Sequence, residues 1–368
     1  QIGTEQMSGV AIVNQLLFVY NLCLFGGVSG AGIFTAQYFG QKNQEGVRQT
    51  VRFKIWMVSL ITLFTVILLL AVGDPLILLY LQGEGTAESV ASTLRYGREY
   101  LHIMLPGLIP FMLVQVYSST LRECGKTILP MKAGVIAVLV NLILNYILIY
   151  GKFGAPALGV RGAAIATVIS RFVECAIVLI HTHRRAQEHP FVLGLYATLK
   201  VPASLMIKII TKGMPLLLNE TLWAAGTAML TQCYSVRGLN VIAALNISNT
   251  INNVFNIVFI ALGESVAIIV GQLLGAGKMD EARDTDNKMI AFSVFSCVLI
   301  AIVMLLLAQF FPLLYNTNDE AKKLATYFIM LTAVFMPQNA FLHASYFTLR
   351  SGGKTIITFL FDSVFIWC

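Results

Sequence analysis

The sequence predicts an all-α polytopic membrane protein built from two pseudo-symmetric helical bundles. Of the 368 residues, 57% are hydrophobic and 12% are charged, and the mean hydropathy is +0.77. These values lie outside the range of soluble domains. Long stretches without Asp, Glu, Lys or Arg, such as 6–41 and 289–318, exceed the roughly 20 residues that a helix needs to cross a bilayer. They lack the alternation of a membrane strand, which excludes a β-barrel.

An internal repeat divides the chain into two related halves. Residues 30–51 (GAGIFTAQYFGQKNQEGVRQTV) recur as residues 265–286 (SVAIIVGQLLGAGKMDEARDTD), so that Gln37 corresponds to Gln272 and Gly40 to Gly275. A second echo relates YSSTLRECGKT, which begins at Tyr117, to YFTLRSGGKT. Duplication on this scale inside a hydrophobic chain is typical of transporters, which hold the substrate between the two copies.

Hydropathy and the repeat together define the expected elements. We expect ten helices, at 10–39, 53–73, 95–121, 131–150, 159–181, 213–236, 240–274, 287–315, 321–349 and 355–368. They form an N-terminal bundle (1–181) and a C-terminal bundle (213–368), joined by a linker (182–212). Pro106, Pro110 and Pro337 are expected to kink their helices. Extending the repeat at both ends predicts twelve helices, six per bundle, with the first and last outside this chain.

Charge predicts the orientation. The odd-numbered connections and adjoining helix ends carry 17 of the 25 Lys and Arg residues, so the positive-inside rule makes them cytoplasmic. The net charge of +7 is then a topological signal, and nucleic-acid binding is not expected because no basic stripe with interleaved aromatics exists elsewhere. His181, His183 and His189 lie in the linker, where a solvated segment is favoured over a metal site. The scattered cysteines lack metal-ligand spacing, so we expect no metal centre.

Glu220 is the strongest candidate for transport chemistry. It is the only acid in helix 213–236, about 10 Å from the predicted cytoplasmic end. A charge there costs about 2.5–3.5 kcal/mol, so Glu220 is expected to face protein or water. A buried carboxylate without a fixed counter-ion can exchange a proton or Na⁺ for a cationic substrate. The alternative to this functional role is a structural one, in which polar groups of a neighbouring helix neutralise Glu220.

Asparagines mark two further polar faces. Asn246, Asn249, Asn253 and Asn256 share one face of an apolar helix, which either lines a cavity or bonds to another helix. Asn141 and Asn145 repeat the i, i+4 spacing in the first half. Arg171 and Glu174, at i, i+3 inside a span, are expected to form a structural ion pair.

Several stretches resemble the MATE family of multidrug and toxic compound extrusion transporters. They include GAGIFTAQYFGQKNQEGVRQ, NLILNYILIYG, LGVRGAAIATVIS, KGMPLLLNETLW, IAALNISNTINNVF and VGQLLGAGKMDEAR, and they span nearly the whole chain. The resemblance implies twelve helices in two bundles that form a V. It also implies a multi-pass protein of the cell inner (plasma) membrane that exports amphipathic organic cations, drugs or metabolites in exchange for Na⁺ or H⁺.

The resemblance also implies site residues. Glu220 matches a functional Glu of the second bundle, and its usual Asp partner corresponds to Asn339. The cation site of the first bundle would use Asn141, Asn145 and Thr167, with Asn145 standing where many members have Asp. We expect a monomeric, non-enzymatic antiporter whose only cofactor is the coupling ion. The alternatives are a flippase for a lipid-linked precursor, with a more cationic cavity, and a membrane-embedded lipid enzyme, for which no nucleophile or metal cluster is visible.

Overall fold

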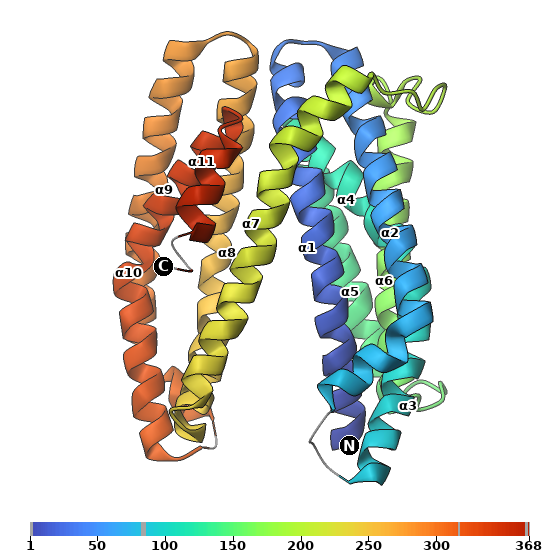
Figure 1. The fold of residues 1–368 in the computed structure, drawn as a ribbon, viewed down its shortest axis with the longest axis vertical. Coiled ribbons are helices and arrows are strands. Elements are labelled where there is room, and N and C mark those ends of the chain that lie inside the picture. The colour runs from blue at the N-terminus through green and yellow to red at the C-terminus, as the bar shows by residue number, and fades with distance from the viewer. Residues whose placement is uncertain (1–2, 82–85, 316, 365–366, 368) are drawn as a thin grey trace. The chain divides into compact units, whose positions relative to one another are not determined.

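Helices make up the fold of this computed structural model, which describes residues 3–81, 86–315, 317–364 and 367 (Figure 1). The chain divides into two compact units. Unit 1 comprises 1–35 and 44–213, and unit 2 comprises 36–43 and 214–368. Eight of the described helical segments are long and apolar enough to cross a membrane. The predicted helices are present in chain order, and the all-α prediction is confirmed. Of the last one, predicted over 355–368, residues 365, 366 and 368 lie outside the described residues.

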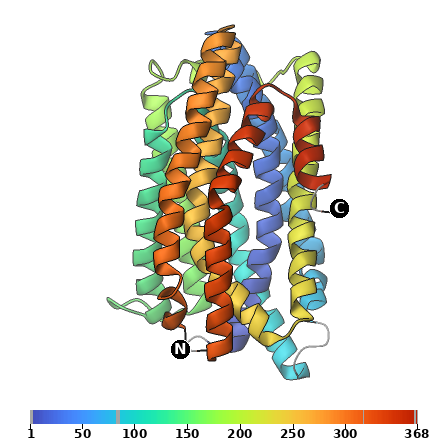
Figure 2. The same cartoon turned by 90° about the vertical axis from the view of Figure 1, so that its left-hand side faces the viewer.

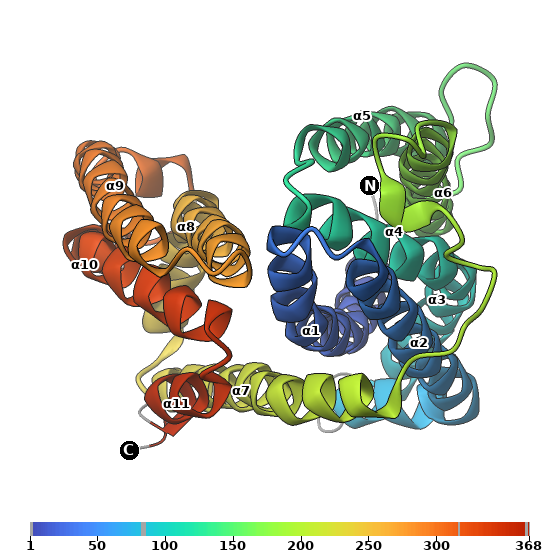
Figure 3. The ribbon, with the colours of Figure 1, turned by 90° about the horizontal axis from the view of Figure 1, so that it is seen from above.

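Unit 1 begins with α1 (Thr4–Gly40) and α2 (Gln44–Tyr80), and continues with α5 (Ile128–Tyr150) and α6 (Val160–Arg184). Between them, the expected helix 95–121 is split into α3 (Ala87–Met104) and α4 (Leu108–Glu123) by a 3₁₀ turn at Leu105–Gly107. Pro106 lies in that turn, which confirms the predicted kink. The sequence reading missed a kink in α2, where Val72 leaves helical geometry just before Pro75. Within this unit α6 packs against α3, α4 and α5 (Figure 3).

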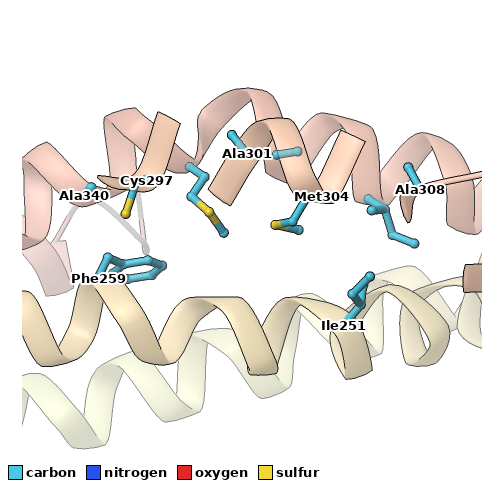
Figure 4. Close-up of a cluster of buried hydrophobic side chains, with 10 residues drawn as sticks. Ile251, Phe259, Cys297, Ala301, Met304, Ala308 and Ala340 are labelled. Atoms are coloured by element: carbon cyan, nitrogen blue, oxygen red, sulfur yellow. The ribbon is translucent and has the colours of Figure 1, made fainter. Parts of the chain in front are cut away.

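Unit 2 is built on α8 (Leu239–Gly275), α9 (Met279–Leu307) and α10 (Asp319–Ser351), which pack together along their lengths (Figures 2 and 3). Their core contains Ile251 and Phe259 from α8 and Cys297 and Met304 from α9 (Figure 4). Small residues on α10 allow this close approach, since its fully buried face carries alanines at helical spacing. These are Ala321, Ala325, Ala333, Ala340 and Ala344. α10 stays helical through Pro337, and the kink expected there stays a prediction.

The remaining helices are α7 (Ala203–Ser235) and α11 (Thr355–Phe359), and α11 passes into a π-helical turn at Leu360–Val364. α7 starts ten residues before its predicted start, because the two lysines of its first turns kept that stretch out of the predicted span. The start of α7, up to Gly213, belongs to unit 1, and the rest of the helix belongs to unit 2.

The two copies of the repeat motif touch each other inside unit 2, to which residues 36–43 belong. A Cβ atom on Gly40 would overlap the carbonyl oxygen of Gln272, and a Cβ on Gly275 would overlap that of Gln37. The side chain of Gln37 also donates from Nε2 to the carbonyl oxygen of Ser351 at 2.9 Å. The repeated glycines are thus required by a backbone-to-backbone crossing of α1 and α8.

Candidate functional site

A polar network joins α7, α10 and the π-helical turn within unit 2. Asn219 is 2% exposed, and its Nδ2 donates to Asp362 Oδ2 at 2.7 Å and to the hydroxyl of Tyr346 at 3.4 Å. The hydroxyl of Ser363 donates to Asn219 Oδ1 at 2.5 Å. Both ends of the amide are therefore occupied, which fixes its orientation. The wider π turn brings two consecutive side chains, Asp362 and Ser363, onto the same residue.

Glu220 follows Asn219 on α7 and is partly exposed. The charged groups that act on its carboxylate are Arg350 of α10 and Asp362. Arg350 is 2% exposed, and its guanidinium lies 5.9 Å from the ring centre of Tyr346. This network, formed by Asn219, Glu220, Tyr346, Arg350 and Asp362, is called the α7–α10–α11 network below.

Asn339, the predicted partner of Glu220, does not interact with it in the described structure. Asn339 offers its backbone carbonyl oxygen to His343 Nδ1 at 3.2 Å, and its side chain is not among the groups that act on Glu220. The second carboxylate that acts on Glu220 is Asp362, which was not among the residues predicted for the site. The signal that could have found it is its position in an apolar helix that follows the repeated GKT motif.

The asparagine face of α8 is exposed. Asn246, Asn249 and Asn253 are exposed and Asn256 is partly so, so hydrogen bonding between helices is not their role in the described structure. That role falls to Asn252, 8% exposed, whose Nδ2 donates to Ser248 Oγ at 3.1 Å and to Thr332 Oγ1 at 3.3 Å. The other alternative, a polar lining, remains a prediction for the exposed face.

The three residues predicted for the first-bundle cation site come together in unit 1. Asn141 Nδ2 donates to Thr167 Oγ1 at 3.3 Å, and Asn145 Nδ2 donates to Asn141 Oδ1 at 2.9 Å. Asn145 Oδ1 is buried without a hydrogen-bond partner among the described residues. An amide oxygen in that state is a ready ligand for a cation or a water molecule.

The predicted ion pair between Arg171 and Glu174 is not formed. Arg171 reaches toward α4 and the 3₁₀ turn before it. Its Nη1 lies 3.5 Å from the carbonyl oxygen of Gly107 in that turn, and its guanidinium lies 4.7 Å from the ring centre of Phe111 in α4. Glu174 points toward α5, since its Oε1 is 3.8 Å from where a Cβ on Gly134 would lie. Spacing of i, i+3 allows a pair, but α6 packs between two helices that draw the side chains apart.

A buried ion pair was missed by sequence reasoning. Lys54 of α2 is fully buried, and its Nζ lies 2.5 Å from Glu123 Oε2 and 3.1 Å from Ser119 Oγ at the end of α4. Both charges stand at helix ends that were assigned to the cytoplasmic surface. Only the packing of α2 on α4 shows that they face each other.

Most linker residues between α6 and α7 are exposed, as expected of a solvated segment, but part of the linker is anchored to unit 1. Arg52 of α2, 4% exposed, donates from Nε to the carbonyl oxygen of Leu195 at 3.0 Å and from Nη2 to that of Gly194 at 2.8 Å. His183 stacks on Tyr196 with ring centres 6.0 Å apart. Among the described residues no group of three His, Cys, Asp or Glu could hold a metal ion.

Outside the membrane-spanning helices, one ionisable group in the linker has a shifted pKa. Burial of His189, and secondarily the positive charge of Lys126, lower the pKa of its imidazole below the usual 6.5. The folded protein therefore favours neutral His189.

Comparison with known proteins identifies relatives along the whole chain. A protein-family model described as MatE matches residues 1–147 and 215–364. The chain is 29% identical over 374 residues to a probable multidrug resistance protein NorM of Thermotoga maritima, covering 99% of this chain and 76% of the relative. It is 24% identical to the probable multidrug resistance protein YoeA of Bacillus subtilis, covering 100% of this chain and 78% of the relative.

Solved structures agree on the fold. An outward-facing multidrug resistance MATE family transporter matches with a TM-score of 0.84 at 17% identity, covering 99% of this chain and 78% of the other. The bent form of the Vibrio cholerae MATE transporter VcmN matches with a TM-score of 0.78 at 20% identity, covering 99% and 83%.

Proposed function

This chain belongs to the MATE family of multidrug efflux transporters, multi-pass membrane proteins and not enzymes, and from that premise we propose that it exchanges amphipathic organic cations for Na⁺ or H⁺. The observation that carries the proposal is the α7–α10–α11 network, in which the buried guanidinium of Arg350 and the carboxylate of Asp362 both act electrostatically on Glu220. Family membership also removes the lipid-enzyme alternative.

The charge balance of the network supports cation exchange. Glu220 and Asp362 bring two negative charges against the single positive charge of Arg350, so the ionised network has a net charge of about −1. An uncompensated charge within a membrane costs about 2.5–3.5 kcal/mol even on the lenient insertion scale. A proton, a Na⁺ ion or a cationic substrate each removes that cost, and repulsion between like charges means that one occupant disfavours the next.

Competition for the same negative charge is what couples two cations in antiport. Binding of the coupling ion on one side of the membrane displaces the substrate, and binding of the substrate on the other side displaces the ion. Asn219 and Tyr346 position Asp362 for this exchange through the hydrogen bonds described above. Glu220, which is partly exposed, is the carboxylate that reaches incoming ligands.

Dye efflux from proteoliposomes tests the proposal. The full-length protein is reconstituted, loaded with a fluorescent organic cation, and challenged with an imposed Na⁺ or H⁺ gradient. We expect gradient-dependent efflux that falls at least about 10-fold in Glu220→Gln, since an amide cannot bind a proton or neutralise a cation. The matched control is Glu264→Gln, which alters another partly exposed carboxylate in unit 2 and should transport normally. Unchanged efflux and ion dependence in Glu220→Gln would remove Glu220 from the mechanism.

A further inference from the structure

Arg171 is a positive charge in the middle of α6 that the proposed exchange mechanism does not use. It lies between Thr167 of the first-bundle amide cluster and Glu174 on one membrane-spanning helix. A guanidinium inside a membrane costs about as much as a carboxylate, so it is expected to have a partner or a function. In the described part of the chain, Arg171 forms no ion pair within 4 Å, and Glu174 acts on it from a greater distance.

The hydrogen-bonding capacity of Arg171 is mostly unused. A guanidinium has five N–H donors in a rigid fork. Its one hydrogen bond in the described structure, to the carbonyl oxygen of Gly107, is long at 3.5 Å. On the same helix, Arg161 donates to both oxygens of Glu99, at 2.9 and 2.7 Å. The contrast shows which ligand geometry the fork of Arg171 lacks, namely a carboxylate that accepts two hydrogen bonds.

Aromatic residues lie around the guanidinium of Arg171 but accept no hydrogen bonds from it in the described structure. Phe111 lies 4.7 Å beneath it, and Tyr20 lies 6.2 Å from Phe111. The hydroxyl of Tyr20 is engaged with Thr62 Oγ1 at 2.8 Å, and that of Tyr100 donates to Asn14 at 3.2 Å. Both tyrosines act electrostatically on Arg171, so they lie near it while their hydroxyls bond elsewhere. The rings therefore leave most N–H donors of Arg171 without an acceptor among the described residues, which is the chemistry that recognises an anionic group.

The break between α3 and α4 makes room for this arrangement. Gly107 ends the 3₁₀ turn, and a Cβ there would lie 3.0 Å from Val168 and 3.6 Å from two atoms of Arg171. A larger residue would push Val168 and Arg171 away from α4. The turn therefore holds the guanidinium against Phe111. Arg171 lies one helical turn from Thr167, which accepts a hydrogen bond from Asn141.

We propose that Arg171 binds an anionic group, most simply a carboxylate, of the transported molecule. Arg171 is then a specificity-determining residue, which favours those organic cations of the proposed function that also carry a carboxylate. Only the claim that the bound molecule is transported rests on the proposed function, because the binding of a carboxylate at Arg171 can be measured without transport.

Equilibrium dialysis with two matched dyes tests it. Rhodamine 110 carries a free carboxylate, and rhodamine 123 is its methyl ester, so the two differ in one negative charge. The measured quantity is the ratio of their affinities for the purified full-length protein. Dialysis is preferred because it does not depend on the emission of the bound dye. We expect Arg171→Gln to lower the acid-to-ester affinity ratio about 10-fold or more, by removing charge-assisted hydrogen bonds.

Two controls make the result decisive. Arg161→Gln removes the neighbouring, carboxylate-paired arginine of α6 and should leave the ratio unchanged. Rhodamine 123 binding reports whether Arg171→Gln is folded. If that variant does not fold, Arg171→Lys decides, since it keeps the charge but loses the planar fork and should still lower the ratio.

The outcomes separate the two proposals. A wild-type ratio that Arg171→Gln leaves unchanged overturns the assignment of Arg171, as expected if a carboxylate of the protein itself neutralises this residue. Ratios that fall in Arg171→Gln but not in Arg161→Gln support it. Absence of gradient-driven efflux of both dyes from proteoliposomes would refute the proposed function and leave the binding result standing.

Discussion

The buried pair of Lys54 and Glu123 permits a quantitative test of how unit 1 is held together. Lys54 is fully buried and Glu123 is 7% exposed, and their charged atoms are 2.5 Å apart. Removing one partner leaves the other charge in a medium that solvates it poorly, and such changes cost about 3–5 kcal/mol. We therefore expect Glu123→Gln and Lys54→Met each to destabilise the protein by about that amount.

The double variant is expected to recover most of the loss. Lys54→Met with Glu123→Gln buries no charge, and replacing both partners by neutral groups of similar size is often close to neutral. The coupling free energy from the double-mutant cycle should then be at least about 2 kcal/mol. At roughly 2–4 °C per kcal/mol for a unit of this size, each single variant lowers the thermal midpoint by about 10 °C, and the double variant by much less.

The assay measures the thermal midpoint of unfolding of each variant in the same detergent. The folded fraction that survives heating is read by size-exclusion chromatography with fluorescence detection. Asp74→Asn is the matched control, because Asp74 pairs with Arg98 where both side chains are well exposed. An exposed pair is worth about 0–1 kcal/mol, so its loss should barely move the midpoint. Additive effects of the two buried substitutions would refute the reasoning that the charges stabilise each other.

Three further predictions concern the helix crossing and the linker. Gly40→Ala places a Cβ on the carbonyl oxygen of Gln272, a backbone atom that cannot rotate away, so we expect a loss of stability greater than about 1–3 kcal/mol and a reduced yield of folded protein. Arg52→Met releases two linker carbonyl groups, and trypsin should then cut after the exposed Lys200 faster than in the wild type. His189 is neutral in the folded protein, so the unfolded chain takes up a proton first as the pH falls below about 6.5, and the thermal midpoint should drop on acidification. His189→Gln should reduce that drop.

A control or a contradicting outcome accompanies each of these predictions. Gly27→Ala meets only the flexible end of Met57 and should be mild, so equal effects of the two alanine substitutions would contradict the crossing argument. Unchanged trypsin cleavage in Arg52→Met would show that other contacts hold the linker. An identical pH dependence in the His189→Gln variant would mean that groups other than His189 control acid stability.

The architecture was predictable because it depends on local properties. Apolar length, the positions of proline and the internal repeat are all read along the chain, and they predicted ten helices, the break at Pro106 and the equivalence of Gly40 with Gly275. The repeat also explains why those two glycines are needed, although their contact appears only when α1 and α8 cross.

The candidate site was predictable only in part. The amides of Asn141 and Asn145 were read from spacing and do meet, since neighbours at i, i+4 share a helix face. Spacing wrongly predicted an ion pair between Arg171 and Glu174. Side chains at i, i+3 pair only if no neighbouring helix offers either of them a different position. The asparagines of α8 were placed on one face correctly, but that face is exposed, and Asn252 makes the contact with α10.

By itself, the sequence determined the membrane class, the two-bundle repeat and the family, because each follows from composition or from order along the chain, and it singled out Glu220 as the residue to test. Only the tertiary structure decided which charges meet. It placed Asp362 beside Glu220, Lys54 against Glu123, and Arg171 over Phe111 without an ion pair. The physical reason is that the cost of a charge in a membrane depends on its nearest neighbours, and for these residues the nearest neighbours belong to other helices.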